Sequence, residues 1–243
     1  MLCWICNRNE ANSREHKTKR SDLAAVLGSP TQDQPLFFHD LKRQNKLVGS
    51  LDAKILKAPI RICDECYSTR TQPHDRAWEH MSDQLRNRPL VIGQWVRTNR
   101  LFHYDTRRQM INVHLFFVKL FGCMLFEAKT NGYEVPIDIQ PFSDSIMMNR
   151  PHREVHIEFG KHDGTVGRSN LHCWKSEHGS VFAGWLYELD NIAVSVLLAQ
   201  EGRWEPRPDR WHPHSSTSSK RLRIQDFMYA NRVATEGERS SDG

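Results

Sequence analysis

Four cysteines in two short motifs are the residues of this chain with the clearest chemistry. Cys3 and Cys6 form one C-x-x-C motif, and Cys63 and Cys66 form another. Each motif presents two thiolates from a tight turn, and four thiolates at tetrahedral corners are the ligands of a structural Zn²⁺. We therefore expect one structural zinc ion to staple the N-terminal part of the chain.

Two disulfides are an alternative interpretation of these four cysteines, and it stays open at this stage. The first residues contain no apolar segment typical of a secretory signal, so the sequence gives no sign of an oxidising compartment. A redox-active dithiol normally needs only one C-x-x-C motif beside a βαβ unit, whereas this chain has two. The remaining cysteines, Cys123 and Cys173, stand in apolar surroundings and are expected in the core.

Length and composition limit the possible architectures. A chain of 243 residues has room for two modest domains. The net charge of +5 fits a nucleic-acid partner but does not establish one. The longest apolar run, residues 115–126, contains a lysine and is shorter than the ~20 residues that a membrane helix needs. We expect it to be a buried helix of a cytoplasmic protein that has no membrane span.

Local patterns predict the elements that position the cysteines and the intervening Glu15 and His16. An N-cap residue before a short apolar segment and a glycine after it indicate a helix. Pro59 limits a strand that contains it to the edge of a sheet. The predicted order is a hairpin region carrying Glu15 and His16 (13–19), a short helix (21–28), an edge strand (55–62) and a helix with an apolar stripe (71–85).

This order, over residues 1–88, resembles the HNH family of the ββα-metal nucleases. The stretch Arg70-Thr71-Gln72-Pro73-His74-Asp75-Arg76-Ala77-Trp78-Glu79 is similar to a subset of HNH proteins from bacteria and phages. The resemblance implies that His16 is the general base that activates water and that Glu15 binds a catalytic Mg²⁺ or Mn²⁺ ion. It also implies DNA as the partner and the cytoplasm of a bacterial or phage-infected cell as the location.

Two positions depart from the family pattern. The family places Asn or His directly after the second C-x-x-C motif as a further ligand of the catalytic ion, and Tyr67 stands there. A neutral phenol is a poor ligand for Mg²⁺. The expected middle asparagine is also missing, with residues 57–59 (Lys-Ala-Pro) in its place. His74 follows Tyr67 by about two helical turns, so it is the candidate replacement ligand.

Basic residues near these motifs suit contacts with phosphate groups. The candidates are Lys17, Lys19, Arg20 and Arg70. A solvated charged turn is the alternative for the three that follow His16. The Glu-His pair by itself is a common chance match, and only its position between the two cysteine motifs gives it weight.

The remaining sequence, residues 89–228, predicts a second α+β domain with an antiparallel sheet and an unknown role. Short β-branched and aromatic runs predict strands at 155–159, 181–187 and 192–198, packed on a helix at 113–126. His212 and His214 are expected in a loop, and the basic segment 219–223 is either an edge strand or a phosphate contact. Residues 229–243 are expected to be a disordered tail.

The sequence therefore predicts an α+β protein with a zinc-stapled, HNH-like ββα-metal module and a second α+β domain. The predicted function is that of a metal-dependent HNH endonuclease that hydrolyses phosphodiester bonds in DNA. The alternative is a catalytically degenerate zinc-binding module that binds nucleic acid or a protein partner without cutting. The C-terminal domain would position the substrate or bind the protein partner.

Overall fold

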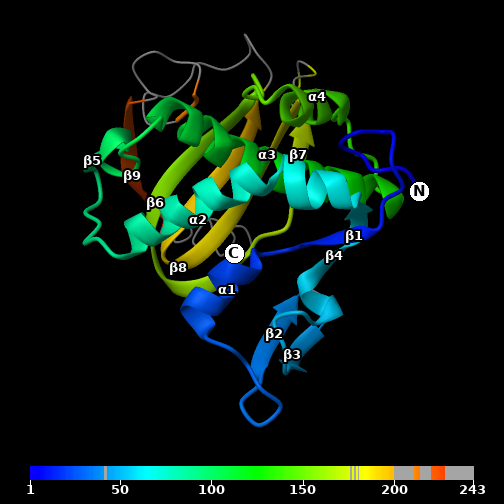
Figure 1. Cartoon of the computed structure of the whole chain (residues 1–243), viewed down its shortest axis with the longest axis horizontal. Helices are drawn as coiled ribbons and strands as arrows, with labels where there is room; N and C mark the ends of the chain where they lie inside the picture. Colours follow the sequence, from blue (N-terminus) through cyan, green and yellow to red (C-terminus); the bar gives the residue numbers. More distant parts are fainter. Residues whose placement is uncertain are drawn as a thin grey trace, which may run out of the picture.

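The chain folds into a mixed α+β structure in which helices cover a five-stranded sheet (Figure 1). The computed structural model describes residues 1–40, 43–175, 177, 179, 181–199, 211–213 and 220–227. Helices α2 (Gln72–Arg86) and α3 (Thr106–Thr130) run across the long strands β6 (Val155–Arg168) and β8 (Val181–Ala199). The predicted tail at 229–243 and His214 lie outside the described residues.

The N-terminal elements follow the predicted order. Strand β1 (Ser13–His16) pairs antiparallel with β4 (Lys57–Ile62), and a bulge interrupts the register between Arg14 and His16. The short helix is α1 (Arg20–Leu27), and α2 begins with a proline in its first turn, where a missing N–H costs nothing. A π-helical segment, η2 (Glu65–Arg70), joins the second cysteine motif to α2. Strand β1 thus pairs with a strand far along the chain, and not within a local hairpin.

A second hairpin, which the sequence analysis did not predict, lies between α1 and β4. It consists of β2 (Leu36–Asp40) and β3 (Arg43–Val48), which pair antiparallel. A short 3-10 segment, η1 (Lys54–Leu56), leads from this hairpin into β4. Val48 packs in a small apolar cluster with Leu23 of α1, which fixes the base of the hairpin.

The main sheet has the strand order β5-β9-β6-β8-β7. Its neighbours are antiparallel except β6 and β9, which run parallel. The two predicted runs at 181–187 and 192–198 are one long strand, β8. The short strands are β5 (Trp95–Arg97), which continues into the 3-10 segment η3 (Thr98–Arg100), β7 (His172–Lys175) and β9 (Arg221–Asp226). Cys173 of β7 is exposed, so its prediction as a core residue is wrong, whereas Cys123 is buried.

Helix α3 is the central helix of the core. By length and composition it is the one helix of the described chain that could cross a membrane, but 83% of its most apolar window is buried inside the protein. Helix α4 (Gln140–Met148) packs beside it, with Phe121 and Phe142 in edge-to-face contact at 5.4 Å. The apolar composition of α3 is therefore that of a core helix.

One hydrophobic cluster runs through both halves of the chain. Ile5, Trp78, Phe117 and Tyr187 all belong to it. The Ser143 hydroxyl of α4 donates to the carbonyl oxygen of Ile5 at 2.5 Å, which ties the first cysteine motif to α4. The domain boundary near residue 88 stays a prediction, and the core continues across it.

A buried carboxylate fixes α1 against α2 and β8. Asp22 accepts hydrogen bonds from Nε1 of Trp78 at 2.7 Å and from the hydroxyl of Tyr187 at 2.6 Å. The Tyr187 hydroxyl accepts in turn from the backbone N–H of Lys19 at 3.0 Å. Burial raises the pKa of Asp22, so these donors offset part of the cost of burying a carboxylate.

We predict that Gly122→Ala destabilises the fold, although Gly→Ala inside a helix normally stabilises by about 1 kcal/mol. A Cβ on Gly122 of α3 would clash with the ring of Trp4, which lies in the first cysteine motif. Overpacking of this kind costs about 1–3 kcal/mol. Urea unfolding measures the loss, and in a double-mutant cycle Trp4→Leu should relieve it. Strictly additive effects of the two substitutions would contradict the close contact.

Candidate functional site

The four predicted cysteines meet at one point. The sulfur atoms of Cys3, Cys6, Cys63 and Cys66 all lie within 4.8 Å of one another. The Sγ atoms of Cys6 and Cys63 are 3.7 Å apart, well beyond the ~2 Å of a disulfide bond. Among the described residues this is the one cluster of three or more Cys, His, Asp or Glu side chains that could hold a metal ion. Such a set of four thiol ligands fits a structural Zn²⁺.

Local backbone geometry supports this cluster. Asn7 adopts a left-handed conformation (φ 49°), and its N–H donates to the carbonyl of Cys3 at 2.8 Å, which closes the first turn. In the second turn the N–H of Cys66 points to Sγ of Cys63 at 3.4 Å. The side-chain amide of Asn9 approaches the same sulfur at 3.8 Å. N–H donors of this kind stabilise thiolates and orient them toward a metal.

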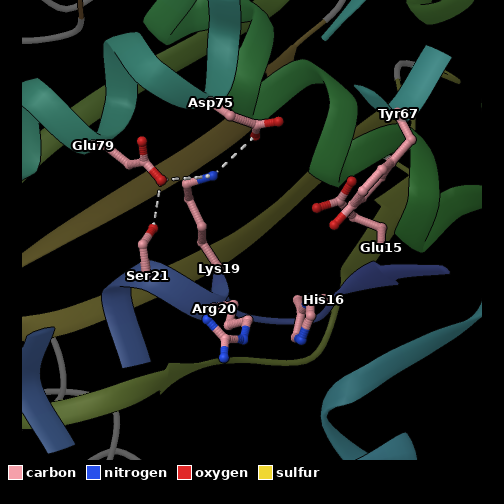
Figure 2. A pocket seen from close by; sticks show the side chains of 8 residues that line it. All are labelled: Glu15, His16, Lys19, Arg20, Ser21, Tyr67, Asp75 and Glu79. Atoms are coloured by element: carbon pink, nitrogen blue, oxygen red, sulfur yellow. Dashed lines mark hydrogen bonds and ion pairs between the residues drawn. The ribbon is translucent and has the colours of Figure 1, made fainter. Parts of the chain in front are cut away.

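A small polar pocket of about 200 Å³ is lined by residues of β1, α1, η2 and α2 (Figure 2). Glu15 and His16 reach it from the end of β1, and Tyr67 reaches it from η2. Figure 2 shows Asp75 and Glu79 extending from α2 toward Lys19. The lining residues are Glu15, His16, Lys19, Arg20, Ser21, Tyr67, Asp75 and Glu79.

A buried ammonium group lies between two of these carboxylates. Nζ of Lys119 is 3.0 Å from Oε2 of Glu15 and 2.8 Å from Oδ1 of Asp75. The Lys119 side chain is fully buried, and α3 delivers it from the core side of the pocket. One internal cation therefore joins β1, α2 and α3 through two of the carboxylates that line the pocket.

The charges in this group depend on one another. Burial alone would lower the pKa of Lys119, but the carboxylates of Asp75 and Glu15 outweigh it and raise the pKa above its usual range. Burial raises the pKa of Glu15, and the ammonium of Lys119 opposes that shift. The raised pKa keeps Lys119 charged at neutral pH. Its positive charge in turn offsets part of the cost of burying the two carboxylates.

His16 is held in the arrangement of a neutral imidazole. Its Nε2–H donates to the carbonyl oxygen of Leu51 at 3.2 Å, since a carbonyl can only accept. Burial lowers the pKa of His16 more than Leu51 and the nearby Asp52 raise it. Nδ1 is then the nitrogen left to take up a proton, which is the state that a general base requires.

Within the described chain, the residues around Glu15 form no cluster of three metal-ligating side chains. The Lys119 ammonium lies 3.0 Å from Oε2 of Glu15 and competes with a metal ion for that carboxylate. The neutral phenol of Tyr67 lines the pocket in place of an amide or imidazole ligand. His74, the candidate replacement ligand, is buried and does not line the pocket. Burial, and then the charge of Lys119, lowers the pKa of His74 to about 4.

The predicted phosphate contacts are mostly engaged within the protein. Lys19 lies 3.2 Å from Glu79 and 3.5 Å from Asp75. Arg20 pairs with Asp52, and Arg70 pairs with Glu65, both at 3.3 Å. Lys17 is half-buried and lies 5.9 Å from the centre of the Phe38 ring.

Sequence reasoning missed Lys119, although one signal pointed to it. It is the lysine inside the apolar run at 115–126, and a lysine buried in a core requires a paired carboxylate. The sequence analysis named Asp75 and Glu79 only as members of the stretch 70–79 that resembles HNH proteins and gave them no role in the site.

No family model, curated protein or solved structure matches this chain.

We predict that the native protein binds one zinc ion per chain and that Cys66→Ala abolishes this binding. The sulfur of Cys66 is fully buried within the cluster, so three ligands would remain, and folding of a small zinc module depends on the metal. Elemental analysis of the purified protein measures the zinc. Cys123→Ala is the matched control, since Cys123 is buried outside the cluster and its loss should leave the zinc in place. Two disulfides and no zinc in the native protein would contradict the assignment.

We predict that Lys119→Met destabilises the protein by about 3–5 kcal/mol, because it removes the buried cation from Glu15 and leaves Asp75 with Lys19 alone. Millimolar Mg²⁺ should then raise the melting temperature of the variant but not that of the native protein. Differential scanning fluorimetry measures both. Lys175→Met on the exposed strand β7 is the control. A saturable Mg²⁺ effect on the native protein would show that Lys119 does not occupy the ion's position.

Proposed function

We propose that this chain is a zinc-stabilised, HNH-like module that binds DNA without cutting it. The observation that carries the proposal is the buried ammonium of Lys119 between Glu15 and Asp75. Metal-dependent hydrolysis needs a divalent ion that neutralises the charge developing on the phosphate. An ion at Glu15 would have to share this carboxylate with a fully buried lysine that pairs with both Glu15 and Asp75. In this proposal Lys119 takes the place of a divalent ion as the cation beside Glu15 and Asp75, so the site holds its arrangement without a catalytic metal.

Several features support DNA as the partner. The chain carries a net charge of +5, and polyanions are the partners that such a charge attracts. The order of β1, β4 and α2, with one cysteine turn before β1 and the other between β4 and α2, resembles modules that act on DNA. In this proposal the zinc has no chemical role and stabilises strand β1, which carries Glu15 and His16, against α2.

Hydrolysis of DNA by the same module is the second candidate function, and His16 favours it. A neutral imidazole held by the carbonyl of Leu51, with Nδ1 available, has the form of a general base. The His16 side chain lines the same pocket as Glu15. His16 as the base and Glu15 as a metal ligand remain the residues on which this second candidate rests.

One pair of assays separates the two functions. We expect the native protein to bind DNA fragments with an affinity that falls steeply as salt rises, because binding releases counterions from the phosphates. We expect supercoiled plasmid to stay intact in Mg²⁺ or Mn²⁺. His16→Ala and the exposed control His103→Ala should bind as the native protein does.

Two results would overturn the proposal in different ways. Plasmid nicking by the native protein that is lost in His16→Ala but kept in His103→Ala would establish the nuclease. Absence of any salt-dependent DNA binding by folded, zinc-loaded protein would exclude DNA as the partner.

A further inference from the structure

The outer face of strands β5 and β9 combines one tryptophan with three arginines. Trp95 is directly opposite Arg223 in the register, and Arg97 is directly opposite Arg221. Directly opposed residues of an antiparallel pair point to the same side of the sheet. All four side chains are exposed, and Trp95 is 50% exposed. The pair between them, Val96 and Leu222, is buried, so the four residues form one continuous outer surface.

The charge of this surface is strongly positive. Lys220 precedes β9 and is also exposed. One carboxylate lies close to these basic residues: Glu158 of β6 is beside the register position of Arg223, because Phe159 pairs with Ile224. Within the described part of the chain, no ion pair involves Arg97, Arg221 or Arg223. These arginines thus differ from Arg20 and Arg70, which are paired within the protein.

We infer that this β5/β9 surface binds single-stranded DNA, with Trp95 stacking on a base and the arginines contacting the phosphates on either side. A half-exposed indole ring on the same sheet face as three arginines combines the two interactions that hold single strands: base stacking and backbone neutralisation. Arginine suits phosphate because its fork donates two parallel hydrogen bonds. The inference rests on the proposed function and specifies its DNA surface and strandedness.

An unpaired strand fits this surface better than a duplex does. The faces of bases in a duplex are covered by their neighbours, so an indole ring can stack only on a base that is free. Strand β5 is also the edge of the sheet, which leaves one side of the surface open for an extended chain. Figure 1 shows β5 and β9 at the end of the molecule remote from the N-terminus and from β1 and β4. Substitutions here therefore leave the cysteine cluster and the pocket intact.

The test is fluorescence anisotropy with a labelled oligodeoxythymidine of about 20 nucleotides, long enough to span a typical single-strand site. Trp95→Ala should weaken binding about tenfold, and Trp95→Phe should retain most of the affinity because it keeps a stacking ring. The double variant Arg97→Glu, Arg223→Glu should weaken binding by more than tenfold and reduce its salt dependence. Lys46→Glu, on the exposed hairpin strand β3, is the charge-reversal control and should bind as the native protein does. Melting curves verify that each surface variant is folded.

The outcomes separate this inference from the proposed function. If the native protein binds DNA and the β5/β9 variants bind equally well, the inference is wrong while DNA binding stands. If the arginine variants weaken binding to duplex and single strand alike and Trp95→Ala changes neither, the surface contacts only phosphates and the stacking role is wrong. Tighter binding of the matching RNA, lost in the same variants, would assign the surface to RNA. If the native protein binds no nucleic acid, both proposals fail.

Discussion

The ammonium of Lys119 is the interaction on which the arrangement of the site depends. It lies fully buried between Glu15 and Asp75, and a buried cation is tolerated only where carboxylates compensate for its desolvation. This requirement fixes the rotation of α3 about its axis. Gly122 lies on the same side of the helix, three residues further on, and receives the ring of Trp4. One face of α3 thus holds both β1 and the first cysteine turn.

This arrangement separates the stabilising charges from the surfaces that remain open to a partner. Zinc at the four cysteines and the lysine at Glu15 would each be a cation paired with anionic ligands inside the protein. Lys19, Arg20 and Arg70 then have intramolecular carboxylate partners, which leaves little of the predicted phosphate surface around the pocket. The β5/β9 surface is different because its arginines point away from the core. In this account DNA is held by the second half of the chain while the module near the N-terminus retains its fold.

The sequence revealed the features that depend on local spacing. The C-x-x-C motifs predicted the cysteine cluster, and capping and apolar periodicity predicted α1 and α2 to within one residue. The helix predicted at 113–126 is longer, since α3 spans Thr106–Thr130. The sequence could not show that Lys119 contacts Glu15, because that contact depends on how α3 packs on β1. The pairing of β5 with β9 was hidden for the same reason, and only the register places Trp95 beside Arg223. Tyr67 and the missing middle asparagine were the local departures from the HNH pattern.

The most direct test of this account is titration of the native, zinc-loaded protein with Mn²⁺, followed by electron paramagnetic resonance, which detects the free ion. Because the Lys119 ammonium already neutralises Glu15, the account predicts no specific Mn²⁺ binding below millimolar concentrations, in the native protein and in Glu15→Gln alike. One Mn²⁺ bound per chain at micromolar concentration, and lost in Glu15→Gln, would contradict it and assign the pocket to metal-dependent catalysis.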